Sequence, residues 1–203
     1  MCIRFFECLR LRAARELTEG PQRNAEGAYL CATRSPKELV EKVNRVMWRN
    51  TTEAKFITLV YGLLDVECKT LRYANAGHNA PILTRKDGAQ VRLQKGGLIL
   101  GIFEERSYEQ DEIELRPGDR LVMFTDGVTE AVDGEGEEFG EERLAEASRC
   151  GPQLSAEALR RRLLDHVTEF CGGEFEDDAT VVVVAVSERN GDATGCESNA
   201  SRH

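Results

Sequence analysis

Two acidic segments of the sequence stand directly beside apolar runs. Thr125-Asp126-Gly127 follows the apolar run 121–124, and Asp177-Asp178 comes just before the apolar run 181–186. Aspartate and glycine are poor strand residues, so we expect one strand to end at the first segment and another to begin after the second. A carboxylate at the end of a buried strand is held rigidly near solvent, where metal-binding and catalytic groups are usually found.

If the two strands are antiparallel neighbours, the carboxylates of Asp126, Asp177 and Asp178 would converge at one edge of a sheet. Converging carboxylates repel each other unless they share protons or bind a cation. Ligation by oxygen alone selects hard ions such as Mg²⁺ or Mn²⁺. The alternative is that Asp-Gly is only a turn and Asp-Asp only a solvated pair, and short motifs taken alone favour that alternative.

Further strands and helices must position these residues. The run 56–65 is apolar on both faces, which is typical of a strand covered from both sides. Shorter runs separated by turn residues indicate an antiparallel meander, with strands at 70–74, 82–84, 90–93 and 108–115. Helices are predicted at 1–17, 35–50, 139–147 and 155–170, the second capped by Ser35 and burying Leu39, Val43, Val46 and Met47.

The predicted fold class is therefore α+β, with two packed sheets of mainly antiparallel strands covered by helices. Residues 1–34 are predicted to form a partial N-terminal helix and loop, and residues 35–187 the main domain. Residues 188–203 are polar and charged with no apolar pattern, which indicates a disordered tail.

Composition excludes several classes of protein. The 203 residues carry a formal net charge of -9, and no cluster of lysine and arginine is interleaved with aromatic residues. This argues against a nucleic-acid partner and against an anionic membrane surface. The seven cysteines are scattered and form no C-x-x-C motif, which indicates reduced thiols and a cytoplasmic location. The apolar runs are too short to span a membrane.

Three other features could carry chemistry. His78 could contact phosphate or donate a proton, although a turn histidine bonded to backbone is the more ordinary interpretation. Glu130 follows Asp126 by one helical turn and could bind a metal through water, or simply face solvent. Cys196 and Arg202 have the C-x₅-R spacing of cysteine phosphatases, but no strand precedes them and no helix can follow to lower the pKa of the thiol.

Taken together, seven ordered motifs resemble the metal-dependent PPM-type serine/threonine phosphatases, and most closely their bacterial SpoIIE/RsbU-like branch. They are FITLVYG at 56–62, YANAGHNAP at 73–81, GLILG at 97–101, LRPGDRL at 115–121, TDGVTEA at 125–131, FGEERL at 139–144 and DDAT at 177–180. Their order and spacing agree with that family from about residue 35 to residue 186.

This resemblance implies a β-sandwich flanked by helices, with a two-metal Mn²⁺ or Mg²⁺ site at one edge. Asp126 matches the family's Thr-Asp-Gly ligand and Asp177 its C-terminal ligand, with Asp178 the weaker match. A metal-activated water would attack a phosphoserine or phosphothreonine of a partner protein. By family analogy, that partner is a regulator of a sigma factor, such as an anti-sigma-factor antagonist.

One family motif has no counterpart. The family carries an earlier Gly-Asp pair whose aspartate bridges both metals, and the Gly-Asp pairs of this sequence are Gly118-Asp119, in a turn, and Gly191-Asp192, in the tail. We therefore expect an N-terminally truncated domain, either because the chain is a fragment or because the ligand has been lost. The alternative function is a degenerate domain that binds a signalling partner without hydrolysing phosphate.

Overall fold

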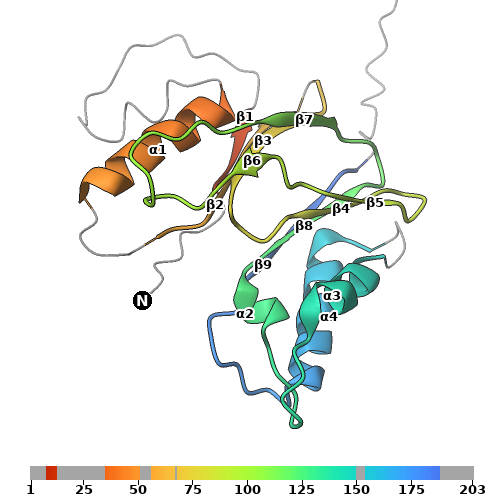
Figure 1. Ribbon diagram of the computed structural model, residues 1–203. Coiled ribbons are helices and arrows are strands. Elements are labelled where there is room, and N and C mark those ends of the chain that lie inside the picture. The colour runs from red at the N-terminus through yellow and green to blue at the C-terminus, as the bar shows by residue number, and fades with distance from the viewer. Residues whose placement is uncertain (1–7, 13–34, 51–55, 67, 150–153, 188–203) are drawn as a thin grey trace, which may run out of the picture.

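The computed structural model describes residues 8–12, 35–50, 56–66, 68–149 and 154–187, and it forms two facing sheets with helices outside them (Figure 1). The first sheet contains β1 (Cys8–Arg12), β2 (Leu59–Asp65), β3 (Thr70–Ala76), β6 (Gly96–Gly97) and β7 (Asp111–Glu114). β2 and β3 are antiparallel, with Leu59 opposite Ala76, and β7 pairs with β3 in the same sense.

The second sheet carries both acidic segments. Its order is β5 (Gln90–Arg92), β4 (Ile82–Thr84), β8 (Arg120–Phe124) and β9 (Val181–Ala185). All neighbouring strands in this sheet are antiparallel, and Phe124 at the end of β8 lies opposite Val181 at the start of β9. The predicted hairpins β2–β3 and β4–β5 and the pairing of the two key strands are therefore confirmed, whereas one continuous meander is not, because β3 and β4 lie in different sheets.

Strand side chains alternate between two apolar layers. Leu121 and Met123 of β8 point inward and pack against Leu71 and Tyr73 of the first sheet. Val122 and Phe124 point outward and pack beneath the C-terminal helices. Because successive residues of a strand face opposite sides, a strand buried on both faces must be apolar throughout.

The helices cover the outer faces of both sheets. α1 (Pro36–Asn50) lies over β2 and β3, burying Leu39 and Val40. On the second sheet lie α3 (Gly140–Ser148) and α4 (Ala156–Phe170), preceded by the short α2 (Asp126–Thr129). α4 begins within one residue of the predicted start, and the Ser155 hydroxyl caps it by accepting a hydrogen bond from Ala158 N at 3.1 Å.

The N-terminal prediction is wrong where the structure describes it. Residues 8–12 form β1, parallel to β2, and not part of a helix. The charged and apolar residues of that segment fit the periodicity of a helix and that of a strand equally well. Pairing with β2 decides in favour of the strand. The predicted loop at 18–34 and the predicted tail at 188–203 lie outside the described residues.

Two details of α1 also differ from expectation. Val46 is 55% exposed, and the buried polar residue Asn44 takes its place on the inner face. The Asn44 amide donates to Phe103 O at 2.8 Å and its oxygen accepts from Gly101 N at 3.0 Å. The Ser35 hydroxyl donates to Gln110 Oε1, the atom that also accepts from Lys37 N, so Gln110 caps the first turn.

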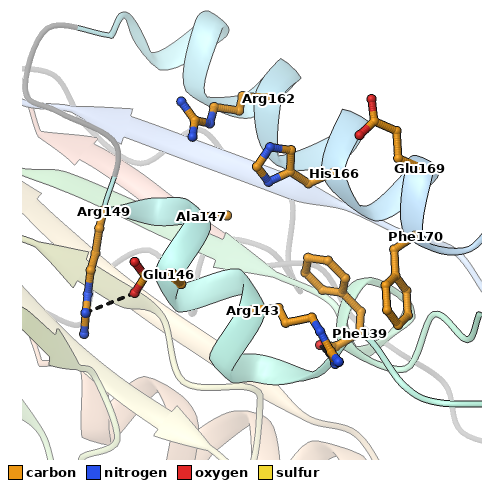
Figure 2. Close-up of a pocket in the computed structure, with 9 residues that line it drawn as sticks. All are labelled: Phe139, Arg143, Glu146, Ala147, Arg149, Arg162, His166, Glu169 and Phe170. Carbon is orange, nitrogen blue, oxygen red and sulfur yellow. Dashed lines mark hydrogen bonds and ion pairs between the residues drawn. The ribbon is translucent and has the colours of Figure 1, made fainter.

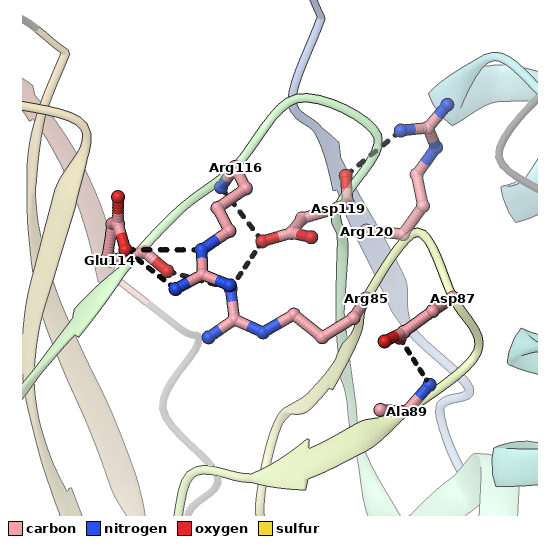
Figure 3. A network of polar contacts seen from close by, with 7 residues as sticks. All are labelled: Arg85, Asp87, Ala89, Glu114, Arg116, Asp119 and Arg120. Atoms are coloured by element: carbon pink, nitrogen blue, oxygen red, sulfur yellow. Dashed lines mark hydrogen bonds and ion pairs between the residues drawn. The ribbon is translucent and has the colours of Figure 1, made fainter.

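A buried ion pair fixes the start of β8 (Figure 3). Asp119 is 1% exposed, and its Oδ2 accepts from Arg85 Nη1 at 2.5 Å and from Arg116 N at 2.9 Å. The same Arg85 nitrogen donates to Glu114 O at 2.8 Å. Asp119 thus ties β4, β7 and β8 together, at the end of β8 remote from Asp126.

Candidate functional site

The two acidic segments lie side by side because Thr125 links them. Thr125 N donates to Thr180 O at 3.1 Å, which extends the β8–β9 pairing by one residue. The Thr125 hydroxyl then accepts from Thr180 N and donates to Asp178 O, both at 2.9 Å. A single side chain therefore sets the path of the backbone between Asp178 and Thr180, directly beside Asp126.

Gly127 brings the same two segments into close approach. It is buried in the first turn of α2, and a Cβ atom there would lie 2.6 Å from Asp178 O and 3.1 Å from Asp177 O. Real Cβ atoms do not approach backbone oxygen so closely. The Asp-Gly pair is thus more than a turn signal, because only glycine admits the 177–178 backbone at this distance.

The carboxylates themselves are oriented partly by their own backbone. Asp126 Oδ1 accepts from Gly127 N at 3.0 Å, and Asp177 Oδ1 accepts from Asp178 N at 2.7 Å. Asp126 is half-buried, whereas Asp177 and Asp178 are exposed. Across the described ranges, no group of three His, Cys, Asp or Glu side chains is placed to hold a metal ion. The strands meet as expected, but the three carboxylates do not form a single metal-binding group.

The donor chemistry of this edge fits a hard divalent cation. The backbone contacts at Thr125 and Gly127 hold carboxylates from two strands near solvent, and carboxylate oxygen is the ligand type that Mg²⁺ and Mn²⁺ take. Asp126 and Asp177 are the residues that would hold such an ion, with Asp178 adjacent. Further oxygen ligands are needed to complete a coordination shell.

His78 belongs to a polar cluster at the same end of the sandwich. The 77–81 loop leads into β4, whose Ile82 lies opposite Val122, so the loop is at the end where β8 stops. The His78 Nδ1 shares a 3.0 Å hydrogen bond with the Thr58 hydroxyl. Asn75 accepts from His78 N and donates to His78 O. The ring is therefore fixed by a hydroxyl and the backbone by Asn75.

Other residues considered from the sequence are placed outside the edge. Glu130 is exposed after α2. Asp119 of the Gly118-Asp119 pair is engaged by Arg85 and Arg116, which rules it out as the missing ligand. Gly191-Asp192, Cys196 and Arg202 lie outside the described residues.

Sequence reasoning missed a groove between α3 and α4 (Figure 2). Its volume is about 690 Å³, and it is lined by Phe139, Arg143, Glu146, Ala147, Arg149, Arg162, His166, Glu169 and Phe170. The helical spacing of Arg162, His166 and Phe170 along α4 is the signal that could have found it.

With this geometry established, comparison with known proteins identifies the family. The family model for Stage II sporulation protein E (SpoIIE) matches residues 11–187, which is most of the sequence. The chain belongs to the SpoIIE family. The match begins before residue 35, where the sequence motifs alone first agree.

Two curated relatives show how much of a longer protein this SpoIIE-family chain matches. The chain is 30% identical over 152 residues to phosphoserine phosphatase RsbU of Bacillus subtilis (strain 168), covering 73% of this chain and 44% of that protein. It is 31% identical over 158 residues to protein IcfG of Synechocystis sp. (strain ATCC 27184 / PCC 6803 / Kazusa), covering 73% and 24% respectively. The chain thus spans less than half the length of these relatives.

Solved structures confirm the fold. The SiaA-PP2C domain of Pseudomonas aeruginosa superimposes with a TM-score of 0.67 at 20% identity, covering 78% of this chain and 63% of that chain. The phosphatase domain of SpoIIE from Bacillus subtilis, presoaked in Mn, gives a TM-score of 0.61 at 20% identity, covering 86% and 78%. The predicted α+β sandwich is therefore that of the PP2C phosphatase domains.

In the part of the chain that the structure describes, no helix combines the length and apolar character needed to cross a membrane.

Proposed function

We propose that this chain is a metal-dependent phosphatase domain that hydrolyses phosphoserine or phosphothreonine on a regulatory partner protein. Membership of a family that includes phosphoserine phosphatases supports the reaction class. The observation that carries the proposal is the Thr125 hydroxyl bonded to Asp178 O beside Gly127, which holds Asp126 and Asp177 at one edge. Such backbone positioning is what a preorganised hydrolytic site requires.

Asp126 and Asp177 would hold Mn²⁺ or Mg²⁺ at this edge. When bound, such ions supply a water of lowered pKa and neutralise charge that develops on the phosphoryl oxygens. The chain's own residues fix the carboxylates: Thr125 sets the backbone beside Asp178, and Gly127 allows the two segments to touch. His78, with its ring held by Thr58, would contact a phosphoryl oxygen or a leaving hydroxyl from the neighbouring loop.

The proposed partner follows from the relatives. RsbU and RsbP of Bacillus subtilis are each named phosphoserine phosphatases, and one solved relative joins an RsbU domain to an RsbW domain. We therefore propose a phosphorylated regulatory protein as the substrate, of the class of anti-sigma-factor antagonists. Phosphate on a small folded protein would reach this edge because Asp177 and Asp178 are exposed.

A second function is favoured by a specific observation. Within the described ranges, the carboxylates do not form a group of three that could hold a metal. A domain with too few ligands would bind a phosphorylated partner without hydrolysing it. The two functions differ in whether divalent cations are needed for turnover.

Hydrolysis of p-nitrophenyl phosphate by the whole chain, measured with and without millimolar Mn²⁺, distinguishes the catalytic function from binding alone. The proposal predicts Mn²⁺-dependent turnover that is lost in Asp126→Asn and kept in Asp165→Asn, which changes an exposed carboxylate of α4. Absence of turnover from folded protein at any Mn²⁺ concentration would exclude the enzyme and leave the binding function.

A further inference from the structure

The groove between α3 and α4 has a distinct aromatic end. Phe139 and Phe170 meet edge to face, with ring centroids 5.4 Å apart and an interplanar angle of 74°. The Arg143 guanidinium lies 5.0 Å from the centre of the Phe170 ring, while its nitrogens bond to Glu137 and to the carbonyls of residues 138 and 139. This end therefore offers a rigid apolar surface beside a fixed positive charge.

The opposite end of the groove is cationic. Arg162 lines the groove from α4 and forms no hydrogen bond or ion pair with any other residue that the structure describes; His166 lies one turn farther along the helix. Arg149 joins them from the end of α3, held by Glu146 at 3.1 Å and by Gln90 at 3.2 Å. An arginine without an ionic partner, as Arg162 is here, is notable in a chain whose net charge is -9.

The acidic residues of the groove do not cancel this charge. Glu146 is already paired with Arg149. The carboxylate of Glu169 points away from α3 in Figure 2. The guanidinium of Arg162 is thus available to a carboxylate of another molecule, with which it could form a bidentate ion pair.

The aromatic end is connected to both segments of the candidate site. Phe139 N donates to Ala131 O at 2.8 Å, just after α2, and α2 begins at Asp126. Phe170 ends α4, and only residues 171–176 separate it from Asp177. Arg162 lies eight residues back along α4, about 12 Å from Phe170 at the rise of an α-helix. The aromatic end is thus the part of the groove that short chain segments join to both Asp126 and Asp177.

We infer that this groove docks the segment of the phosphoprotein substrate that adjoins the phosphorylated residue. A bulky apolar side chain would pack against Phe139 and Phe170, and an acidic side chain farther along would pair with Arg162. The inference rests on the proposed function for the direction of the segment, but binding itself needs no turnover. An acidic protein segment matches the unpaired guanidinium of Arg162, and the aromatic end matches its apolar residue.

Fluorescence anisotropy tests this docking with the whole chain. The probe is a fluorescein-labelled peptide with a central phosphoserine, a leucine on each side of it and glutamates beyond. Arg162→Glu is expected to weaken binding about tenfold, by replacing attraction with repulsion. The matched control is Arg116→Glu, the same charge change on an exposed residue at the far end of β8, where affinity is expected to stay the same. Circular dichroism confirms that both variants fold.

A second peptide with lysines in place of the glutamates is expected to bind at least about tenfold more weakly than the acidic probe. Equal affinity of Arg162→Glu and Arg116→Glu for the acidic probe would overturn the inference, and so would absence of binding by the unaltered chain. Hydrolysis of p-nitrophenyl phosphate with Mn²⁺ reports separately on the proposed function. Binding without that hydrolysis would therefore refute catalysis and keep the docking groove.

Discussion

The hydroxyl of Thr125 lies 2.9 Å from the carbonyl oxygen of Asp178, and the same hydroxyl accepts a hydrogen bond from Thr180 N. These residues are more than fifty positions apart in the chain, yet this one side chain satisfies two backbone groups of the opposite strand. The relative position of Asp126 and Asp177 therefore depends on Thr125, whose hydroxyl bonds to the backbone of the segment that carries Asp177.

Replacing Thr125 by valine is expected to separate the two acidic segments. Valine keeps the shape but removes both hydrogen bonds, which leaves Thr180 N and Asp178 O without that partner and costs about 1–3 kcal/mol. Chemical denaturation and Mn²⁺-dependent hydrolysis measure the two effects. Thr125→Ser restores the hydroxyl and is expected to recover most of both; equal behaviour of the valine and serine variants would refute this role.

Gly127→Ala tests the close approach of the two segments. The added Cβ would lie 2.6 Å from Asp178 O, so the backbone must move apart, at a cost of about 1–3 kcal/mol for a crowded buried site. The rate of Mn²⁺-dependent turnover is expected to fall even under conditions where the Gly127→Ala variant is fully folded. The control is Gly134→Ala, because no atom lies within 4 Å of a Cβ there. Unchanged turnover in Gly127→Ala would contradict the account.

Much of this architecture can be predicted from the sequence, because the apolar pattern of each strand lies within one short segment. β8 is apolar on both faces because it lies between two layers, and its all-apolar run is readable without a structure. β9 has an equally apolar run, although it is an edge strand whose Val182 is exposed. The motif order also identifies the edge that carries Asp126. β1 was missed because its pairing with β2 is a long-range contact that no short pattern encodes.

The site was less readable than the fold. Nothing in the pattern Thr-Asp-Gly reveals that Thr125 bonds to Asp178 O, or that Gly127 is needed for contact and not only for a turn. The groove depends on α3 and α4 facing each other, so Phe139 and Phe170 become neighbours only after the helices pack. Tertiary packing, and not local propensity, decides these features.

The Arg85–Asp119 pair is expected to be structural. Asp119→Ala leaves a guanidinium and a backbone amide without their buried carboxylate, which lowers the free energy of unfolding by about 3–5 kcal/mol. Asp165→Ala, which removes an exposed carboxylate, is the control and is expected to change stability little. Urea denaturation checks both. A stability loss no larger than that of Asp165→Ala would show that the buried pair contributes nothing.

Tyr108 carries a buried hydroxyl with no hydrogen-bond partner among the described residues. Removing it in Tyr108→Phe is expected to stabilise the fold by about 1–3 kcal/mol, because an unsatisfied polar group leaves the core. Tyr73→Phe is the matched control, since the Tyr73 hydroxyl bonds to the Lys95 main chain and its loss is expected to destabilise. Thermal denaturation at neutral pH compares the two; a lower melting temperature for Tyr108→Phe would contradict the prediction.

The same tyrosine predicts an alkaline effect. Burial raises the pKa of Tyr108 to about 12, from an ordinary value near 10. The folded chain therefore holds this proton more tightly than the unfolded chain, and the associated stability is lost as pH rises from about 10 to about 12. Tyr108→Phe is expected to lose less stability over that range. Absorbance of the phenolate at alkaline pH, followed in both proteins, identifies the titrating group.

The affinity of the chain for Mn²⁺, measured by electron paramagnetic resonance of the free ion, shows directly whether Asp126 and Asp177 hold a metal. Asp126→Asn and Asp177→Asn are each expected to weaken binding by at least about tenfold, as loss of groups at a metal site does. Asp178→Asn is expected to weaken it less, and Asp165→Asn not at all. If all four variants bind Mn²⁺ as the unaltered chain does, the edge formed by β8 and β9 is not a metal site.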